Sequence, residues 1–431
     1  MEANNRKILH DLFDAYYLSR KNKRGMMSQL KFEIGYEKKL LELGREISNG
    51  SYSISNSFCF ISFKPLKREI FAADFRDRII HHLIFNYVSP IFERLFINDS
   101  YSCRTGKGTS YGIKRLDHFM RSCSENYKSD CYVLKLDIKG YFMSIDKNIL
   151  YKKIEEKLNN VDKVKNKARA KAKQTFDTAW LIKLIHQIMF HDPTKDCVIK
   201  GSRENWRGLP KSKSLFFTKK DTGLPIGNLT SQLFGNIYLN DFDHFVKYGL
   251  VCKYYGRYVD DMVIVHKDKE YLKSIIPIMR QYLKDELLLE LHPKKIYLQH
   301  INKGVLFLGA FIKPYRIYIR NCVKDNFCKK IQDFNGVLQK SGNPSSASAV
   351  SIMGTIDSAR DVDKDADKNN KKAVACINSY LGMMSHFDTY KLRKKILSEY
   401  LSVDLKKVVH INKGYDKVSL VLFQLLVIFN Q

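Results

Sequence analysis

The sequence predicts an α+β fold in which helical segments flank a central antiparallel sheet. Apolar residues recur at helical spacing near the N-terminus and again after residue 320. Between these regions, the runs 251–257 and 262–266 have the composition of two strands joined by a tight turn, and residues 132–138 have the pattern of a buried strand. With 431 residues and 44% hydrophobic content, the chain is long enough for two or three packed units.

The elements can be assigned in chain order. Residues 1–58 are expected to form a helical N-terminal extension that stops at Asn49-Gly50, and 59–131 to alternate strands and helices. The sheet is expected within 132–320, with an insertion at about 151–221 that contains a lysine-rich run. A helical region at 321–400 carries polar linkers at 341–348 and 361–372. Residues 401–431 are expected to pack against the rest, because their apolar run is too short to cross a bilayer.

The charge favours a nucleic acid as the partner. The chain has 74 Lys and Arg against 45 Asp and Glu, a net charge of +29 and a pI near 9.6. Its nine cysteines form no CxxC pair, which argues against a zinc ribbon or a disulfide framework. No signal peptide opens the chain, so we expect a cytoplasmic protein with reduced thiols and no membrane partner.

Three carboxylates have the pattern of a metal site. Asp260 and Asp261 are adjacent at the predicted hairpin tip, where they repel each other unless a divalent cation bridges them. Asp137 ends the buried strand upstream. A two-metal mechanism holds two Mg²⁺ roughly 3.5–4 Å apart, and we expect Asp137 and Asp260 as shared ligands, Asp261 as an outer ligand and the Ile138 carbonyl as a further donor. The alternative is a polar hairpin turn.

A loop rich in glycine lies between the two acidic strands. Residues 223–232 contain two glycines and a proline, and an apolar run at 233–239 follows with helical spacing. Glycine lets a backbone approach a ligand closely, so this loop is a candidate ligand contact.

The order of these motifs resembles the palm of a reverse transcriptase. Strand-borne Asp, Gly-Pro loop, the YVDD hairpin, Leu-His-Pro-Lys-Lys at 291–295 and Phe-Leu-Gly at 307–309 follow one another in the family's sequence. The resemblance covers about 60–312, with a fainter echo at 378–396. It implies a right-hand polymerase with fingers at 59–131, a palm at 132–320 carrying a fingers insertion, and a helical thumb at 321–400. Ile226 and Ser231-Gln232 resemble the branch of diversity-generating retroelements and phage-defence enzymes, which is similar to group II intron proteins.

The resemblance also implies residue roles. The catalytic residues would be Asp137, Asp260 and Asp261, and Phe142 would act as a gate against the ribose 2′-hydroxyl. The implied dNTP-binding residues are Lys64, Arg68, Phe142, Pro225, Ile226, Gly227 and Lys294, with Lys295 as the alternative lysine. The implied primer and template contacts are Arg76, Arg78, Arg104, Ser231, Gln232, Tyr258, Phe307, Leu308 and Gly309. For any single cation, an ordinary surface charge is the alternative.

The implied function is RNA-directed DNA synthesis with Mg²⁺, for which Mn²⁺ can substitute. The partners would be an RNA template, expected to be a locally encoded non-coding RNA, the DNA product and dNTPs; an accessory protein is left open. Antiviral defence is the favoured role and mutagenic copying in a diversity-generating retroelement the alternative. An RNA-dependent RNA polymerase and a catalytically inert RNA-binding scaffold are the other candidates.

Overall fold

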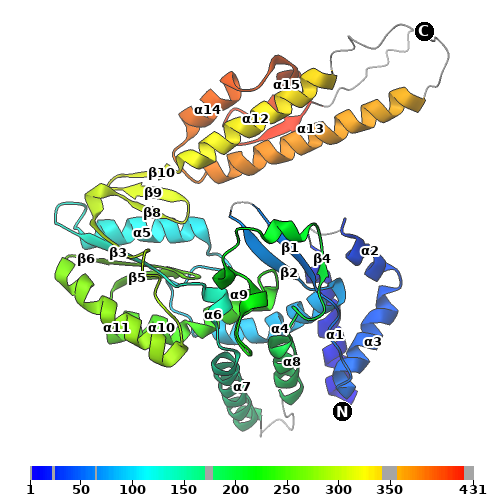
Figure 1. The fold of residues 1–431 in the computed structure, drawn as a ribbon, viewed down its shortest axis with the longest axis vertical. Coiled ribbons are helices and arrows are strands. Elements are labelled where there is room, and N and C mark those ends of the chain that lie inside the picture. Colours follow the sequence, from blue (N-terminus) through cyan, green and yellow to red (C-terminus); the bar gives the residue numbers. More distant parts are fainter. Residues whose placement is uncertain (1, 22–24, 64–65, 170–177, 342–356, 422–431) are drawn as a thin grey trace. The chain divides into compact units, whose positions relative to one another are not determined.

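The computed structural model describes the chain except for residues 1, 22–24, 64–65, 170–177, 342–356 and 422–431 (Figure 1). The chain divides into two compact units, Met1–His300 and Ile301–Gln431. Each has a hydrophobic core of its own. No helix in the described ranges is both long and apolar enough to span a bilayer.

The N-terminal helices pack on a long central helix. They are α1 (Glu2–Ser19), α2 (Met27–Glu33) and α3 (Tyr36–Asn49), and α1 lies against α4 (Phe75–Glu93). Aromatic rings fill the contact: Tyr16 stacks on Tyr36 with centroids 4.8 Å apart and meets Phe75 edge-on at 6.2 Å. The extension is thus part of the main core and not an independent arm.

A small sheet joins two distant parts of the sequence. Strands β1 (Phe58–Ser62) and β2 (Arg68–Ala72) pair antiparallel, and β4 (Val198–Ile199) adds parallel to β1. Strand β4 belongs to the insertion, which also contains α7 (Lys147–Arg169), α8 (Ala179–Phe190) and the 3₁₀ turns η1 (Arg203–Trp206), η2 (Lys211–Lys213) and η3 (Leu215–Phe217). Because its strand completes this sheet, the insertion is structurally part of the same region.

The central sheet is four-stranded and antiparallel, in the order β5-β6-β3-β7. Its strands are β3 (Tyr132–Asp137), β5 (Tyr254–Tyr258), β6 (Asp261–His266) and β7 (Tyr297–His300). Helix α5 (Thr109–Cys123) packs on one face, and α10 (Asn240–His244) and α11 (Lys269–Leu287) lie on the other (Figure 1). The short α6 (Tyr141–Ser144), α9 (Leu229–Tyr238) and the π-helix η4 (Phe245–Gly249) complete this unit.

The second unit starts with a sheet of its own, formed by β8 (Val305–Phe307), β9 (Ala310–Lys313) and β10 (Arg316–Ile319). Helices α12 (Asn321–Ser341), α13 (Asp357–Met384), α14 (Tyr390–Glu399) and α15 (Val403–Val408) follow, with the hairpin of β11 (Val409–Ile411) and β12 (Val418–Leu420). The unit boundary lies about twenty residues before the expected end of the palm, because β8–β10 pair with one another.

One expected segment of the second unit differs from the structure. The polar stretch 361–372 was expected to be a linker, but it lies within α13; its Lys and Ala residues are good helix formers. Of the other expected linker, residues 342–348 lie outside the described residues, as does most of the apolar C-terminal run.

Candidate active site

The sheet register brings the three predicted carboxylates to one end of two neighbouring strands. Asp137, the last residue of β3, is paired directly with Asp261, the first residue of β6. Tyr258 of β5 is also paired with Asp261, so Val259 and Asp260 form a two-residue hairpin loop. Asp137 is only 8% exposed. Opposed residues on neighbouring strands have Cβ atoms roughly 5 Å apart, which is within the span of a bridging cation.

Two lysines supply positive charge to these carboxylates. Lys295 Nζ donates to both carboxylate oxygens of Asp137, at 3.0 and 2.9 Å, and Lys135 Nζ lies 3.3 Å from Asp261 Oδ1. Burial would lower the pKa of Lys295, but its bonds to Asp137 raise it above the ordinary value. Lys295, and not Lys294, is therefore the lysine beside the carboxylates.

The charged form of Asp260 is disfavoured by its surroundings. Burial raises its pKa to about 6, and the charges of Asp137 and Asp261 add to that rise. A carboxylate in this situation gains from a divalent cation, which removes the cost of its charge. The donor set of hard carboxylate oxygens is the one Mg²⁺ prefers.

The carboxylate oxygens of Asp137, Asp260 and Asp261 do not all lie within 4.8 Å of one another. Among the described residues, one group of three acidic or histidine side chains has ligand atoms within 4.8 Å of one another: His10, Asp11 and Asp14. These lie together on the first helix, two of them exposed, and are an ordinary surface cluster. Asp137 and Asp261 each lie beside a lysine ammonium, which offsets part of their negative charge.

A buried network holds the hairpin tip. Val259 has φ +56°, which is costly for a β-branched residue. Its carbonyl accepts a hydrogen bond from Arg257 Nη1 at 2.8 Å, and its N–H donates to Ser102 Oγ at 3.2 Å. Both bonds fix the peptide groups that aim Asp260.

Arg257 is in turn locked by Asp243. Its Nε and Nη2 each donate to the Asp243 carboxylate at 2.7 Å, and neither residue is exposed. Tyr255 adds a third bond to the same carboxylate at 2.7 Å. Burial would lower the pKa of Arg257, but Asp243 raises it above the ordinary value. We did not predict this pair from the sequence; an Arg in a strand of otherwise apolar pattern was the available signal.

The glycine-rich loop is fastened to β2. Phe71 N–H donates to the Ile226 carbonyl at 2.8 Å, and Ala73 N–H donates to Asn228 Oδ1 at 3.1 Å. Gly227 lies between them with φ +133°, and a Cβ there would be 2.7 Å from the Phe71 carbonyl oxygen. The loop and the strand are thus in contact through their backbone atoms, with no space for a side chain at Gly227.

The sequence profile described as "Reverse transcriptase (RNA-dependent DNA polymerase)" matches residues 66–312, which are 247 of the 431 residues. The chain belongs to the reverse transcriptase family. Protein YkfC of Escherichia coli (strain K12) is 23% identical over 266 residues, covering 54% of this chain and 60% of that protein.

Solved telomerase structures are similar at lower identity. The apo telomerase of Candida tropicalis matches with a TM-score of 0.43 and 14% identity, covering 80% of this chain and 61% of that one. The Candida albicans telomerase in complex with a TWJ fragment of telomeric RNA matches with a TM-score of 0.42 and 12% identity, covering 85% and 62%. This chain therefore spans about 60% of the length of these relatives.

The fold is that of a right-hand polymerase, with α+β composition and antiparallel sheets. Within this reverse transcriptase, Phe142 and Ile226 pack at the edge of one small cluster, whose buried members are Cys59, Phe71, Met143 and Leu215. The predicted gate and the predicted nucleotide loop are thus side by side. Leu224 N–H, donating to the Phe142 carbonyl at 2.8 Å, links them directly.

The other predicted nucleotide residues are placed as follows. Arg68 is exposed at the start of β2. Burial raises the pKa of the Tyr258 phenol and the charge of Arg68 opposes that rise, so the two side chains are within electrostatic reach. Pro225 is partly exposed in the loop. Lys64 lies outside the described residues.

Three arginines predicted to contact the template are turned into the protein. Arg76 binds Glu46 and the Ser53 carbonyl, and Arg78 Nε donates to the Ala73 carbonyl at 3.2 Å. Arg104 donates to Glu93 and to the carbonyls of Ile97 and Ser100, with a side chain only 5% exposed. These arginines brace the fold, and Arg104 has little surface left for a phosphate.

The remaining predicted contacts differ in exposure. Ser231 is buried, whereas Gln232 is exposed on α9. Phe307 is fully buried, and Leu308 and Gly309 form the turn between β8 and β9 with φ +48° and +87°. This turn belongs to the second compact unit.

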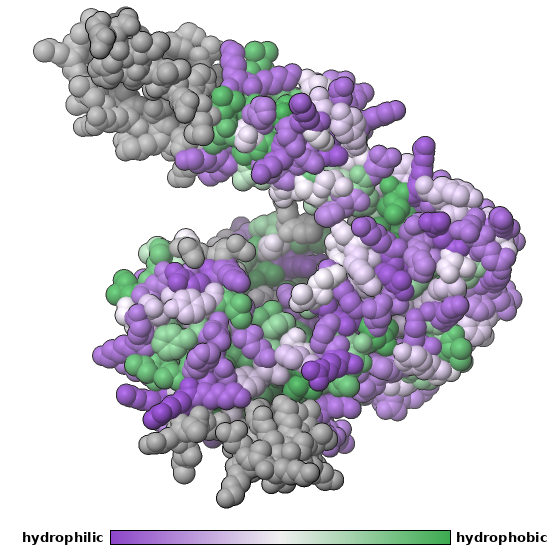
Figure 2. Space-filling view, turned by 180° about the vertical axis from the view of Figure 1, so that it is seen from behind, coloured by the Kyte–Doolittle hydropathy of each residue, from purple (hydrophilic) through white to green (hydrophobic). Residues whose placement is uncertain are grey.

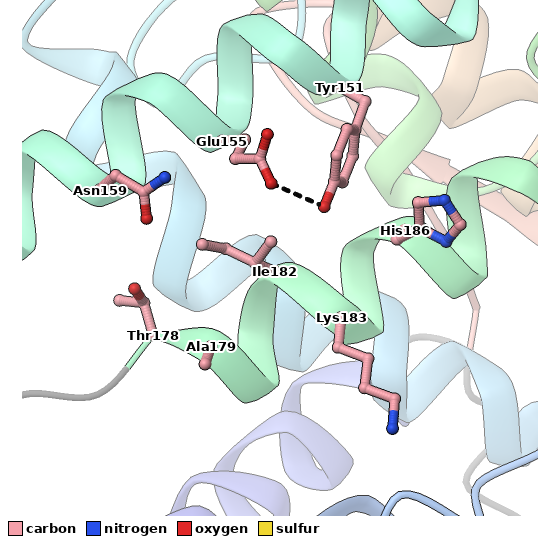
Figure 3. Close-up of a pocket in the computed structure, with 8 residues that line it drawn as sticks. All are labelled: Tyr151, Glu155, Asn159, Thr178, Ala179, Ile182, Lys183 and His186. Atoms are coloured by element: carbon pink, nitrogen blue, oxygen red, sulfur yellow. Dashed lines mark hydrogen bonds between the residues drawn. The ribbon is translucent and has the colours of Figure 1, made fainter.

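A separate cavity of about 450 Å³ lies between α7 and α8 (Figure 3). Tyr151 donates a hydrogen bond to Glu155 at 3.1 Å on one side, and Lys183 and His186 lie on the other. The residues that line this cavity include none of the predicted catalytic residues.

Proposed function

We propose that this protein is an RNA-directed DNA polymerase. The observation that carries the proposal is the register of β3 and β6, which opposes Asp137 and Asp261 and leaves Asp260 at the adjoining hairpin tip. Carboxylates arranged in this way suit two-metal nucleotidyl transfer, in which a primer 3′-hydroxyl attacks the α-phosphate of a dNTP and pyrophosphate leaves.

The metal ligands would be Asp137, Asp260, Asp261 and the Ile138 carbonyl. Two Mg²⁺ ions, or Mn²⁺ in their place, would activate the attacking hydroxyl and stabilise the leaving oxygen. Lys295 contributes an ammonium group beside Asp137, and its bonds to that carboxylate raise its pKa. The flexible Lys295 side chain would be able to reach the departing pyrophosphate and stabilise its charge.

The nucleotide pocket would be formed by Phe142, Pro225, Ile226 and Gly227. The bulk of the Phe142 ring would exclude a ribose 2′-hydroxyl, which would favour dNTPs. The Ile226 side chain has no hydrogen-bond donor, so its contact with the nucleotide would be apolar. Arg68 would bind the triphosphate, because a guanidinium forms bidentate bonds with phosphate oxygens.

The template would be RNA, and a locally encoded non-coding RNA is the favoured source. The net charge of +29 supports a polyanionic partner. Figure 2 shows hydrophilic residues over most of one face of the described surface, with hydrophobic residues in small groups. We propose a role in antiviral defence; near-identical repeats beside the gene that differ at adenines would instead support diversification.

Primer extension on an RNA template tests the activity. We expect dNTP incorporation that needs Mg²⁺ and is abolished in Asp260→Asn. Asp285→Asn changes an exposed carboxylate on α11 that accepts a local hydrogen bond from Gln281; it is the matched control and should extend normally. Equal extension by wild type and Asp260→Asn would refute the proposed mechanism.

The same assay separates the rival activities. If rNTPs are incorporated as well as dNTPs, the gate assigned to Phe142 is refuted and an RNA polymerase is favoured. Template RNA that binds tightly, with no extension by wild type under any nucleotide and metal condition, would favour the inert scaffold.

A further inference from the structure

Two cysteines lie at the ends of the loop that leads into β3. Cys123 is the last residue of α5, and Cys131 directly precedes β3, the strand that ends at Asp137. Cys123 is 4% exposed and Cys131 is not exposed at all. Their side chains share a hydrogen bond, in which the Cys131 S–H donates to the Cys123 sulfur. The two sulfur atoms are therefore neighbours, although eight positions separate them in the sequence.

The loop between the two cysteines is closed by its own hydrogen bonds. The Ser124 carbonyl accepts from the N–H groups of Lys128 and Ser129, both at 2.9 Å. Ser124 Oγ accepts from the Tyr127 N–H, also at 2.9 Å. Residues 125–127 all have φ between +54° and +66°, a conformation that is uncommon outside glycine. These bonds hold the two ends of the loop together, as a disulfide between the flanking residues requires.

Two lysines approach the end of α5 from the neighbouring strands. Ser122 Oγ, one residue before Cys123, shares a hydrogen bond with the Tyr254 hydroxyl at 3.0 Å. Lys253 Nζ lies 5.3 Å from the ring of that tyrosine. Lys267 directly follows β6 and forms an ion pair with an acidic residue of the loop. The surroundings of Cys123 therefore include two ammonium groups.

These surroundings favour the thiolate form of Cys123. The hydrogen bond from Cys131 lowers the pKa of Cys123; burial opposes this, and the charges of Lys267 and Lys253 lower it further, so that the pKa lies below its ordinary value. The same hydrogen bond raises the pKa of Cys131. Thiolates are the nucleophiles of cysteine chemistry, and cysteines that respond to oxidants often have a second thiol beside them. This pair has both properties.

A second pair of cysteines allows a comparison within the same protein. Cys59 of β1 and Cys197, which directly precedes β4, also share a hydrogen bond and belong to one hydrophobic cluster. Burial raises the pKa of both thiols, and the charge of Glu69 raises that of Cys59 further. Contact between two thiols is therefore present in both pairs, whereas surroundings that favour a thiolate are present only at Cys123.

We infer that Cys123 and Cys131 form a peroxide-sensitive thiol pair that regulates the polymerase. The Cys123 thiolate attacks one oxygen of hydrogen peroxide, the O–O bond breaks and hydroxide leaves, which gives a sulfenic acid. The Cys131 sulfur then attacks the Cys123 sulfur and loses its proton, the S–O bond breaks and water leaves, which closes the disulfide. The pair has then lost two electrons, and the peroxide has been reduced to water and hydroxide.

The disulfide would act on β3. It holds its two sulfur atoms about 2.05 Å apart, closer than hydrogen-bonded atoms lie, so the end of α5 and the start of β3 must approach each other. Strand β3 opposes Asp137 to Asp261. A displacement of roughly 1 Å in a catalytic group can slow a reaction about 100-fold. We therefore expect oxidation to slow primer extension, and this part of the inference rests on the proposed function.

The disulfide itself is tested by peptide mapping of the whole chain. The protein is treated with hydrogen peroxide, unreacted thiols are blocked with iodoacetamide in denaturant, and tryptic peptides are identified by mass spectrometry. Trypsin cleaves after Lys128, so Cys123 and Cys131 leave on separate peptides unless a disulfide joins them. We expect the joined peptides, and we expect them about tenfold faster than any bond between Cys59 and Cys197.

Variants and the extension assay complete the test. Oxidised wild type should extend a primer about threefold more slowly or worse, and dithiothreitol should restore the rate. Cys131→Ser should form no such disulfide and should keep its own rate after peroxide treatment. Cys322→Ser, at an exposed position in the second unit, is the matched control and should respond as wild type does.

The two readouts separate the possible failures. Absence of the Cys123–Cys131 disulfide after peroxide treatment, or its formation no faster than that of the other pair, would overturn the inference. A disulfide that leaves primer extension unchanged would overturn the regulation of the polymerase. Peptide mapping needs no activity, so a disulfide in a protein that extends no primer would sustain the thiol pair and refute the proposed function.

Discussion

Arg257 is a positioning residue, and variants at this position should show its effect on stability and its effect on catalysis separately. Arg257→Met leaves the Asp243 charge buried and unpaired, so we expect it to lower the free energy of unfolding by about 3–5 kcal/mol. The double variant Arg257→Met/Asp243→Asn removes that charge and should recover much of the stability. It cannot restore the bond to the Val259 carbonyl. Urea unfolding together with kcat measures both effects.

The outcome that matters is the activity of the stable double variant. We expect kcat to stay at least tenfold below wild type while the KM for dNTP changes little, because the hairpin tip and not the nucleotide pocket is affected. A double variant with wild-type kcat would show that the pair serves only the fold.

His81 makes the fold sensitive to acid. It is buried and shares a hydrogen bond with Thr230 Oγ1 at 2.7 Å, and burial lowers its pKa to about 3. The unfolded chain binds the proton near pH 6.5, so stability is lost as pH falls below that value. Between pH 7.5 and 5 this site should cost about 2 kcal/mol.

The variant His81→Asn keeps an amide donor for Thr230 and cannot titrate. Its stability should fall less than that of wild type over the same pH range, as measured by urea unfolding at each pH. Other titrating groups are common to both proteins, so the difference between them isolates His81. Parallel pH profiles would contradict the assignment.

At the scale of elements, the contact between the nucleotide loop and β2 leaves no room for a side chain. Gly227→Ala places a Cβ against the Phe71 carbonyl at a φ that alanine rarely adopts. We expect the loop to be displaced from the strand, with the KM for dNTP raised about tenfold or more and the fold retained. Gly25→Ala, which has nothing within 4 Å, is the control and should have the wild-type KM.

Local sequence patterns predicted the elements of the candidate site, whereas the side-chain pairs between distant segments could not be predicted. The YVDD turn, the strand ending at Asp137 and the glycine-rich loop all have signals within ten residues. The runs 251–253 were expected in a strand but precede β5, because Val251 turns the chain with φ +54°. Arg257 with Asp243, and Glu69 with Trp206, could not be paired from the sequence, since each partner's burial is set by packing between distant segments.

At the scale of the whole molecule, the two units should melt separately, because each has its own core. Ligand that binds one unit stabilises that unit alone. We expect calorimetry to show two transitions, of which Mg²⁺ raises only the one assigned to Met1–His300. Leu381→Ala, in the core of the second unit, should lower the other transition and identify it.

The Mg²⁺ effect should disappear in Asp137→Asn/Asp260→Asn. The group His10, Asp11 and Asp14 offers a control: Asp14→Asn, at an exposed position, should leave the Mg²⁺ shift intact. A shift that survives the first variant and is lost in the second would place the ion on α1.

The parallel pairing of β1 with β4 also means that β1 is synthesised well before the strand that pairs with it. Cys59 pairs with Ile199, so 140 residues separate the two partners in the chain. At typical ribosomal speeds of about 5–20 residues per second, the outer edge of β1 stays unpaired for about 7–28 s. During that interval an open strand edge is available to other nascent chains. Slow codons within residues 60–200, or expression at low temperature, should therefore increase aggregation. Co-expression of a chaperone that covers strand edges should reduce it.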